Sequence, residues 1–291
     1  MGYSARYHAY SLIAVFIALA IGILIGAGFG QDVVSNTSES LQNSLEGDLN
    51  EARAERDAIA RELDQAQQFS DAVYPALVDG RLAGDRIGVI ALGGLQPDLS
   101  DDVEAALGPT GATLSEVAVV REPPDTGALA DQLQGTKFAR LERDPDALED
   151  LGRVAGRQLV TGGRLFDQIR EQLLNRSSGR AARLDGVIVV RDAPEDLDEP
   201  EQTALDRLEA GLLDGVRAAG RPVVGVEQSD TDPSSVPLFE SHDVPTSDSV
   251  DFVSGRVAAV FVLLGADGNF GTKDTADQLL PDLLVPTTPS R

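Results

Sequence analysis

The chain has 291 residues with 48 acidic and 24 basic side chains, which gives a net charge of −24 at pH 7. A chain this acidic repels nucleic-acid phosphates, which argues against DNA or RNA as a partner. It contains no cysteine, so disulfides, thiolate metal sites and cysteine nucleophiles are all excluded.

The first element along the chain is an apolar segment near the N-terminus. Residues Leu12–Phe29 read LIAVFIALAIGILIGAGF, without one charged side chain. At about 1.5 Å per residue, a helix over Ser11–Gly30 spans roughly 30 Å, the thickness of one hydrocarbon core. A cleaved secretory signal is the alternative, because Gly26–Gly28 resembles a small-residue cleavage site, but its apolar region would be shorter. We therefore expect residues 1–30 to hold a transmembrane anchor in the lipid bilayer.

Charge next to this segment predicts its orientation. Arg6 precedes the span, and acidic residues follow it: Asp32, Glu39, Glu46 and Asp48. Basic residues stay preferentially on the cytoplasmic side of a membrane. The sequence thus predicts a single-pass cell-membrane protein with a cytoplasmic N-terminus and everything after Gly30 outside.

Small residues recur every four positions within the span. They are Ala14, Ala18, Gly22, Gly26 and Gly30. This spacing places them on one helix face, where the backbone of a second helix can approach closely. The pattern predicts self-association through this face, although Gly and Ala are common in membrane helices in general.

Residues 31–79 read as a helical stalk. Between Ser38 and Phe69 there is no proline and a single glycine. Apolar residues fall at helical spacing along it: Leu41, Leu45, Leu49, Ala52, Ile59 and Leu63. A narrow apolar stripe on a long helix favours a coiled coil, here a parallel homodimer. Packing of this helix against the outer domain is the alternative.

Residues 80–291 have the pattern of one α/β domain with a Rossmann-like, mostly parallel sheet. The chain is 42% apolar but only 4% aromatic, so aliphatic side chains must form its core. Short Val- and Ile-rich runs predict four strands: Arg86–Leu92, Thr113–Val120, Asp185–Arg191 and Pro222–Glu227. Helical segments are predicted at Leu99–Leu107, Pro145–Gln158, Arg164–Leu174, Glu201–Ala219 and Ser254–Leu264. Buried strands that alternate with helices are typical of a parallel sheet covered by helices.

The turn after the first strand has part of the pattern of a nucleotide site. Dinucleotide-binding folds carry G-x-G-x-x-G there, with phosphate at the following helix N-terminus. Gly93 and Gly94 occupy the turn, but the third glycine is missing. Asp98, Asp101 and Asp102 then begin the helix and would repel a phosphate. The turn therefore does not predict a nucleotide site.

Two acidic segments are candidate cation sites. Carboxylates follow the third strand: Asp192, Glu195, Asp196, Asp198, Glu199 and Glu201. Such a cluster could hold Ca²⁺ or Mg²⁺, but it also reads as an acidic loop that leads into a helix at Pro200. Asp267–Gly271 resembles the start of a calcium loop and lacks the distal Glu, so we predict a turn there.

The sequence predicts neither an enzyme nor a bound cofactor. The two histidines, His8 and His242, should lie on opposite sides of the membrane. No nucleophile elbow, Walker loop or H-E-x-x-H motif is present.

Two stretches of the chain resemble the MctB family of actinobacterial proteins, described as copper transport outer membrane proteins. They are HAYSLIAVFIALAIGILIGAGF at His8–Phe29 and SGRVAAVFVLLGADGNFGTKDTADQLLP at Ser254–Pro281. With the stalk and α/β domain between them, the resemblance in layout covers essentially the whole chain. It implies a role in copper homeostasis or efflux, and relatives linked to the separation of daughter cells imply an envelope scaffold.

The residues themselves provide few copper ligands. Cu(I) prefers thiolate or thioether sulfur and Cu(II) prefers imidazole, whereas this chain has no cysteine, Met1 alone and two histidines. Two functions therefore stay open. One is a copper-efflux component, and the other is a dimeric, non-enzymatic scaffold that presents the α/β domain to an envelope partner.

Overall fold

The computed structural model describes residues 4–179, 183–192, 194 and 196–282, and it leaves out the side chains of residues 4–7, 28–43, 142 and 145. The chain divides into two compact units, Met1–Gln67 and Gln68–Arg291. The first unit is helical throughout its described part, and the second contains the α/β domain.

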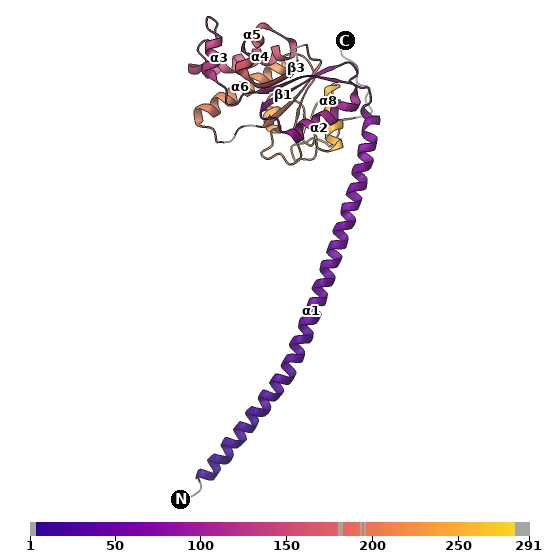
Figure 1. The fold of residues 1–291 in the computed structure, drawn as a ribbon, viewed down its shortest axis with the longest axis vertical. Coiled ribbons are helices and arrows are strands. Elements are labelled where there is room, and N and C mark those ends of the chain that lie inside the picture. The colour runs from indigo at the N-terminus through magenta and orange to yellow at the C-terminus, as the bar shows by residue number, and fades with distance from the viewer. Residues whose placement is uncertain (1–3, 180–182, 193, 195, 283–291) are drawn as a thin grey trace. The chain divides into compact units, whose positions relative to one another are not determined.

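Helix α1, Ser4–Val78, contains the predicted anchor and the predicted stalk without a break (Figure 1). It continues through Pro75, further than the proline-free stretch alone indicated. Its last turns belong to the α/β unit, since Tyr74 and Val78 are buried in that unit's core. The Tyr74 hydroxyl donates a hydrogen bond to the carbonyl of Ala106 at 2.5 Å, which fixes the end of the helix on the domain.

The sheet of the domain has seven strands in the order β3-β2-β1-β4-β5-β6-β7. Their bounds are β1 Arg86–Gly93, β2 Thr113–Val120, β3 Leu174–Gly179, β4 Gly186–Asp192, β5 Val223–Val226, β6 Thr246–Ser247 and β7 Asn269–Phe270. All neighbouring pairs are parallel except β2 with β3, which is antiparallel. The four predicted strands are confirmed as β1, β2, β4 and β5, and the sheet is mixed but mostly parallel.

The remaining strands were not predicted. Five of the six residues of β3 are exposed, so this edge strand has no Val/Ile run to reveal it. Strands β6 and β7 have two residues each. The expectation of a simple turn at Asp267–Gly271 was wrong in part, because Asn269 and Phe270 pair with Thr246 and Ser247 at the sheet edge.

Helices cover both faces of the sheet. Beside α1 they are α2 Pro97–Leu107, α3 Thr126–Gln132, α4 Pro145–Thr161, α5 Arg164–Leu173, α6 Glu199–Arg217, α7 Val236–Ser241 and α8 Val253–Leu263, with short 3₁₀ turns at η1 Gly108–Thr110 and η2 Leu141–Arg143. Alternate residues of β1 point to opposite faces: Ile90 and Leu92 pack with α3 to α6, whereas Val89 and Ala91 pack with α2, α8 and the end of α1. This alternation follows from the two-residue period of a strand.

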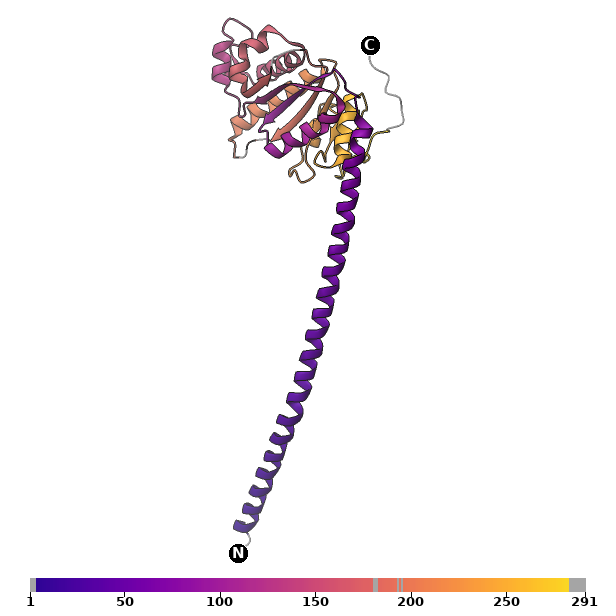
Figure 2. The ribbon, with the colours of Figure 1, turned by 45° about the vertical axis from the view of Figure 1, so that its right-hand side comes forward.

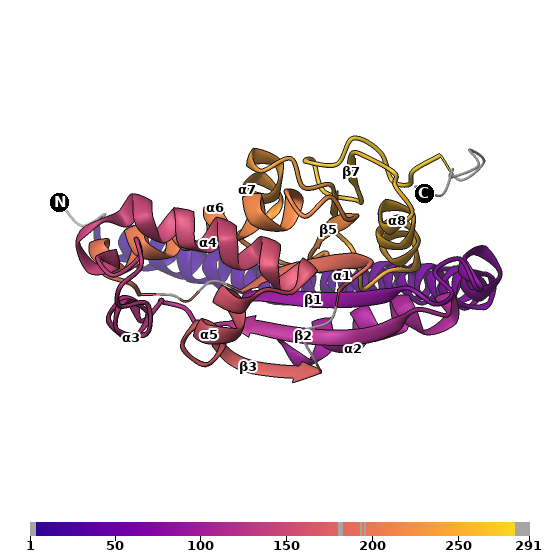
Figure 3. The ribbon, with the colours of Figure 1, turned by 90° about the horizontal axis from the view of Figure 1, so that it is seen from above.

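Two views show the arrangement of these layers. Strands β1, β2 and β3 lie side by side, with α4 along one face (Figure 3). Helix α8 lies beside the last turns of α1 (Figure 2), where the Arg81 guanidinium also sits 4.9 Å from the ring centre of Phe261.

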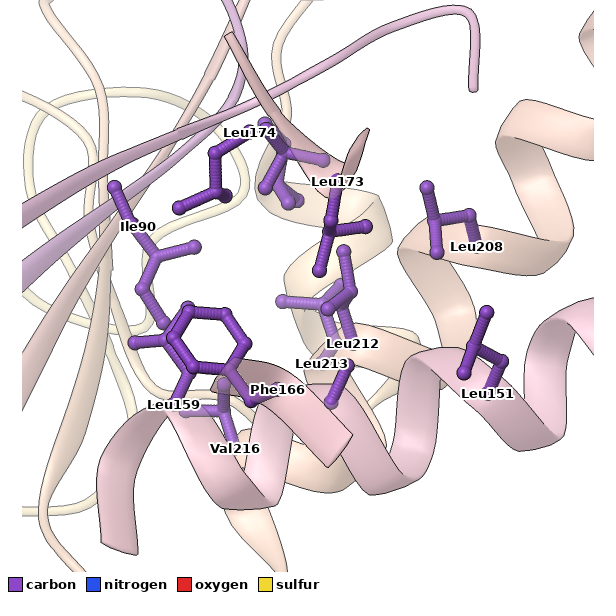
Figure 4. Close-up of a cluster of buried hydrophobic side chains, with 14 of the residues drawn as sticks. Ile90, Leu151, Leu159, Phe166, Leu173, Leu174, Leu208, Leu212, Leu213 and Val216 are labelled. Atoms are coloured by element: carbon purple, nitrogen blue, oxygen red, sulfur yellow. The ribbon is translucent and has the colours of Figure 1, made fainter. Parts of the chain in front are cut away.

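Helices α4 and α6 pack unusually closely. Glycines line both sides of their contact: Gly152 and Gly156 on α4, Gly211 and Gly215 on α6. A Cβ atom at any of them would meet backbone atoms of the other helix, and at Gly152 it would lie 2.8 Å from the carbonyl oxygen of Leu208. The glycines therefore let the backbones touch, while large side chains such as Phe166 fill the space between these helices and the sheet (Figure 4).

Candidate functional sites

The segment able to cross a membrane is the first part of α1. Residues His8–Ala27 form a helical stretch of 20 residues with a mean hydropathy of 2.5, and none of it is buried. Four members of the predicted small-residue face lie in this stretch: Ala14, Ala18, Gly22 and Gly26. A Cβ atom at Gly22 or Gly26 would meet nothing within 4 Å, so this face is open in the single chain. Gly30 lies beyond the side chains that the structure describes.

The predicted stalk stripe is also exposed. Leu45, Leu49, Ile59 and Leu63 are between 49% and 64% exposed, and Ala52 is exposed as well. The side chain of Leu41 lies outside the described set. Four large aliphatic side chains in water on one helix are costly, at about 25 cal/mol per Å² of apolar surface. The stripe is therefore a surface that a partner would stabilise.

The carboxyl ends of β1 and β4 mark the place where open α/β sheets bind ligands. The chain moves from β1 to β2 on one side and returns to β4 on the other, so the strand order reverses between β1 and β4. Gly93 and Asp192 are paired at this end. The structure thus brings the Gly93-Gly94 turn next to Asp192, the first residue of the acidic segment. The sequence analysis had treated the turn and the acidic segment as separate features.

Asp192 lines this crevice at the Gly93-Gly94 turn. The Gly94 amide donates to the carbonyl of Asp192 at 2.9 Å, and a Cβ atom at Gly94 would overlap the Asp192 carboxylate. Gln96 donates to the same carboxylate at 3.2 Å. A carboxylate therefore lies beside the turn at which a dinucleotide fold holds phosphate.

Glu122 is the feature of this edge that the sequence analysis missed. It is the second residue after β2, and both of its carboxyl oxygens are buried without a hydrogen-bond partner among the described residues. Nearby, Arg191 donates to both carboxyl oxygens of Glu209, at 2.7 and 3.1 Å. Burial and the carboxylates of Glu209 and Asp192 raise the pKa of Glu122 to about 9, against the opposing effect of Arg191. Burial also raises the pKa of Glu209, although Arg191 works against the shift.

The other half of the edge, at β5 to β7, holds a connected polar network. Lys273 Nζ donates to Glu227 Oε1 at 2.5 Å and to the carbonyl of Thr231 at 2.8 Å. The amides of Thr272 and Lys273 donate to the two carboxylate oxygens of Asp248. Since Glu227 and Asp248 are almost fully buried and have partners, this half is built for stability.

The C-terminal sequence motif contributes several members of this network. Gly271 has a φ of +143°, and a Cβ atom there would overlap the Asp248 carboxylate. Arg256 donates to Asp102 at 2.8 Å, and Asp102 also accepts from Gln228 at 2.8 Å. The motif therefore ties α2, α8 and the C-terminal segment to the sheet edge.

Metal-binding geometry is absent from the part of the chain that the structure describes. There, no three His, Asp or Glu side chains are placed to hold one ion. Within the predicted acidic segment, Asp198 and Glu201 form a capping box at the start of α6, while Glu195 lies outside the described residues. His242 is engaged by Asp214, with 2.7 Å between His242 Nδ1 and Asp214 Oδ1. Asp198 and Glu201 thus cap a helix, and His242 pairs with a carboxylate.

One long N-terminal helix, apolar enough in its first part to cross a membrane, followed by a mixed, mostly parallel α/β sheet is the layout of a membrane or envelope protein with an α/β domain. The family described as "Copper transport outer membrane protein, MctB" matches residues 3–281, and the chain belongs to this family. The predicted resemblance is confirmed.

Curated relatives share the family name. The copper transporter MctB of Mycobacterium bovis is 34% identical over 104 residues, and so are those of two strains of Mycobacterium tuberculosis. The matched region covers 36% of this chain and 32% of each relative. The chain therefore matches about a third of the length of these curated relatives, which carry the name of a transporter and not of an enzyme.

Proposed function

We propose that the protein is a non-enzymatic, membrane-anchored cell-envelope protein that acts in copper homeostasis. Residues 1–30 would be the anchor, 31–79 the stalk, and 80–291 an α/β domain outside the cytoplasm. The observation that carries the proposal is the exposed apolar helix His8–Ala27 in a chain of a copper transport family.

The proposed orientation rests on charge. Arg6 is the one charged residue before the span, and the remainder of the chain is strongly acidic. The positive-inside tendency then keeps the N-terminus in the cytoplasm. A reporter enzyme that is active only outside the cytoplasm, fused after Arg291, should be active. Activity of a matched cytoplasmic reporter at the same position, with silence of the first, would reverse the topology.

Copper itself fits the outer part of the chain poorly. Copper sites use several Cys, Met or His side chains that converge on one ion. After residue 30, His242 is the one side chain of these types, and it is paired with Asp214. We therefore place the copper effect in a partner or in envelope integrity, and assign no copper ligand to the α/β domain.

A dimeric scaffold that presents the α/β domain to an envelope partner, for example in cell separation, is the second candidate. The exposed stripe of Leu45, Leu49, Ile59 and Leu63 favours it, because no described residue covers these side chains. A deletion strain separates the two: copper sensitivity with normal cell separation supports the first function. Chained cells with normal copper tolerance support the second.

A further inference from the structure

Glu122 stands out among the buried carboxylates of the domain by its isolation. Glu209 and Glu227 are also buried, but each is bound by a cation, Arg191 and Lys273 respectively. Both oxygens of Glu122 lack a partner in the described part of the chain. A carboxylate without partners loses its hydration on burial and gains nothing in return, so its charged form is strongly disfavoured there.

The position of Glu122 is enforced by its neighbours. Gly93 has a φ of +80°, and a Cβ atom on it would lie 2.8 Å from Glu122 Oε2. The absence of a side chain at Gly93 thus provides the space in which the carboxyl group lies. Residues 121–124 are partly exposed, so the segment that carries this buried carboxyl group borders on solvent.

The charges around Glu122 are predominantly negative. Strand β4 contributes Arg191 and Asp192, and α6 contributes Glu209, with Asp206 beside the ion pair. Strand β1 and the start of α2 contribute the uncharged Gly93, Gly94 and Gln96. The guanidinium of Arg191 is already shared with both oxygens of Glu209. Arg191 therefore lowers the pKa of Glu122 only through its charge, because it donates no hydrogen bond to Glu122.

We propose that Glu122 is a proton-dependent switch for the β2–α3 loop: its protonated side chain lies buried against Gly93, and loss of the proton releases it, with residues 121–125, into water. In the closed loop the Arg121 amide donates to the carbonyl of Leu173, and the Arg121 guanidinium donates to the carbonyls of Gln172 and Leu174. Opening the loop would break these bonds between Arg121 and the α5–β3 junction.

The direction of the pH effect follows from linkage. The closed loop keeps the proton up to about pH 9, whereas an open, hydrated Glu122 has the ordinary glutamate pKa. Between these two values the open form binds fewer protons than the closed form, so rising pH favours opening. Closure is complete below the ordinary pKa and weakens as the pH rises through neutrality.

Hydrogen exchange on the full chain in detergent tests this proposal. The variant Glu122→Gln keeps the size of the side chain but cannot be charged. Exchange rates of the segment that contains Arg121 are compared between wild type and this variant at matched pH. The ratio of wild-type to variant exchange rates should rise by about tenfold per pH unit between about pH 5 and 9. Glu104→Gln, at an exposed glutamate, is the matched control and should track the wild type.

An infrared measurement on the same samples keeps the test decisive if the variant folds poorly. Wild-type protein at neutral pH should show the carbonyl band of a protonated carboxylic acid, and this band should vanish at alkaline pH. A rate ratio that does not change with pH, or an infrared spectrum without the acid band at neutral pH, would overturn the proposal.

Discussion

Gly156 of α4 lies against the backbone carbonyl of Leu212 in α6, so closely that a Cβ atom on Gly156 would overlap the oxygen. Gly211 and Gly215 of α6 make the reciprocal contacts with Glu149 and Arg153 of α4. The backbones of the two helices are therefore in direct contact, and only glycine fits at these positions.

This contact predicts that Gly156→Ala destabilises the domain. The added methyl group must push α4 from α6, and overpacking of this kind costs about 1–3 kcal/mol. Gly47→Ala is the matched control, because Gly47 is also helical but has nothing within 4 Å of its Cβ position. Urea unfolding of the full chain measures both variants. Equal stability of the two would contradict the close helix contact.

The buried pair of Lys273 and Glu227 makes a second prediction. Glu227 is 3% exposed, so Lys273→Met leaves a buried carboxylate without a cation, which costs up to about 3–5 kcal/mol because only hydrogen bonds from Ser234 and Ser235 remain. The double variant Lys273→Met with Glu227→Gln removes that charge and should recover a large part of the loss. Thermal unfolding of the single and double variants provides the comparison. An additive loss in the double variant would show that the pair is not coupled.

The exposed stalk stripe predicts disulfide crosslinks between chains. The protein has no native cysteine, so Leu45→Cys or Leu49→Cys introduces the one thiol of each chain. Oxidation in membranes should give a covalent dimer, because a parallel homodimer would place these positions opposite each other. Glu51→Cys lies two residues further on, on the other side of the helix, and should crosslink much less. Absence of crosslinks at both leucine positions would exclude the dimeric stalk.

The strands that could be predicted from the sequence are those whose own residues form a continuous apolar run. Strands β1, β2, β4 and β5 carry Val- and Ile-rich runs, and their type and position are confirmed. Strand β3 escaped prediction because its polar residues are held by pairing with β2, a contact far away in sequence.

The environment of Glu122 at the sheet edge depends even more than strand β3 does on contacts between residues far apart in the sequence. Glu122 lies beside Arg191 and Glu209, more than sixty residues later in the chain, so neither its burial nor its missing partners can be read locally. The spacing of the four glycines in α4 and α6 is likewise visible in the sequence. Their role in the close contact between the two helices appears only in the folded domain. By contrast, the apolar stretch and the aliphatic stripe of α1 could be read from the sequence, since helical periodicity alone places their residues on one face.

Copper binding by the purified protein should be weak. The full chain in detergent is expected to bind Cu(II) less tightly than about micromolar, or about −8 kcal/mol, and Cu(I) no better than another acidic protein does. His242→Ala should change little, because His242 is paired with Asp214. A tight, stoichiometric site in calorimetry that survives His8→Ala and His242→Ala together would show that carboxylates bind copper here.

We expect the chain to support copper homeostasis as an anchored envelope protein without being a copper-binding protein itself. Copper tolerance of a deletion strain, complemented with three forms of the gene, measures this most directly. The full chain and His242→Ala should both restore tolerance, whereas residues 31–291 exported behind a cleaved signal should fail because the anchor is missing. Unchanged copper tolerance on deletion, or failure of His242→Ala to restore it, would contradict the account.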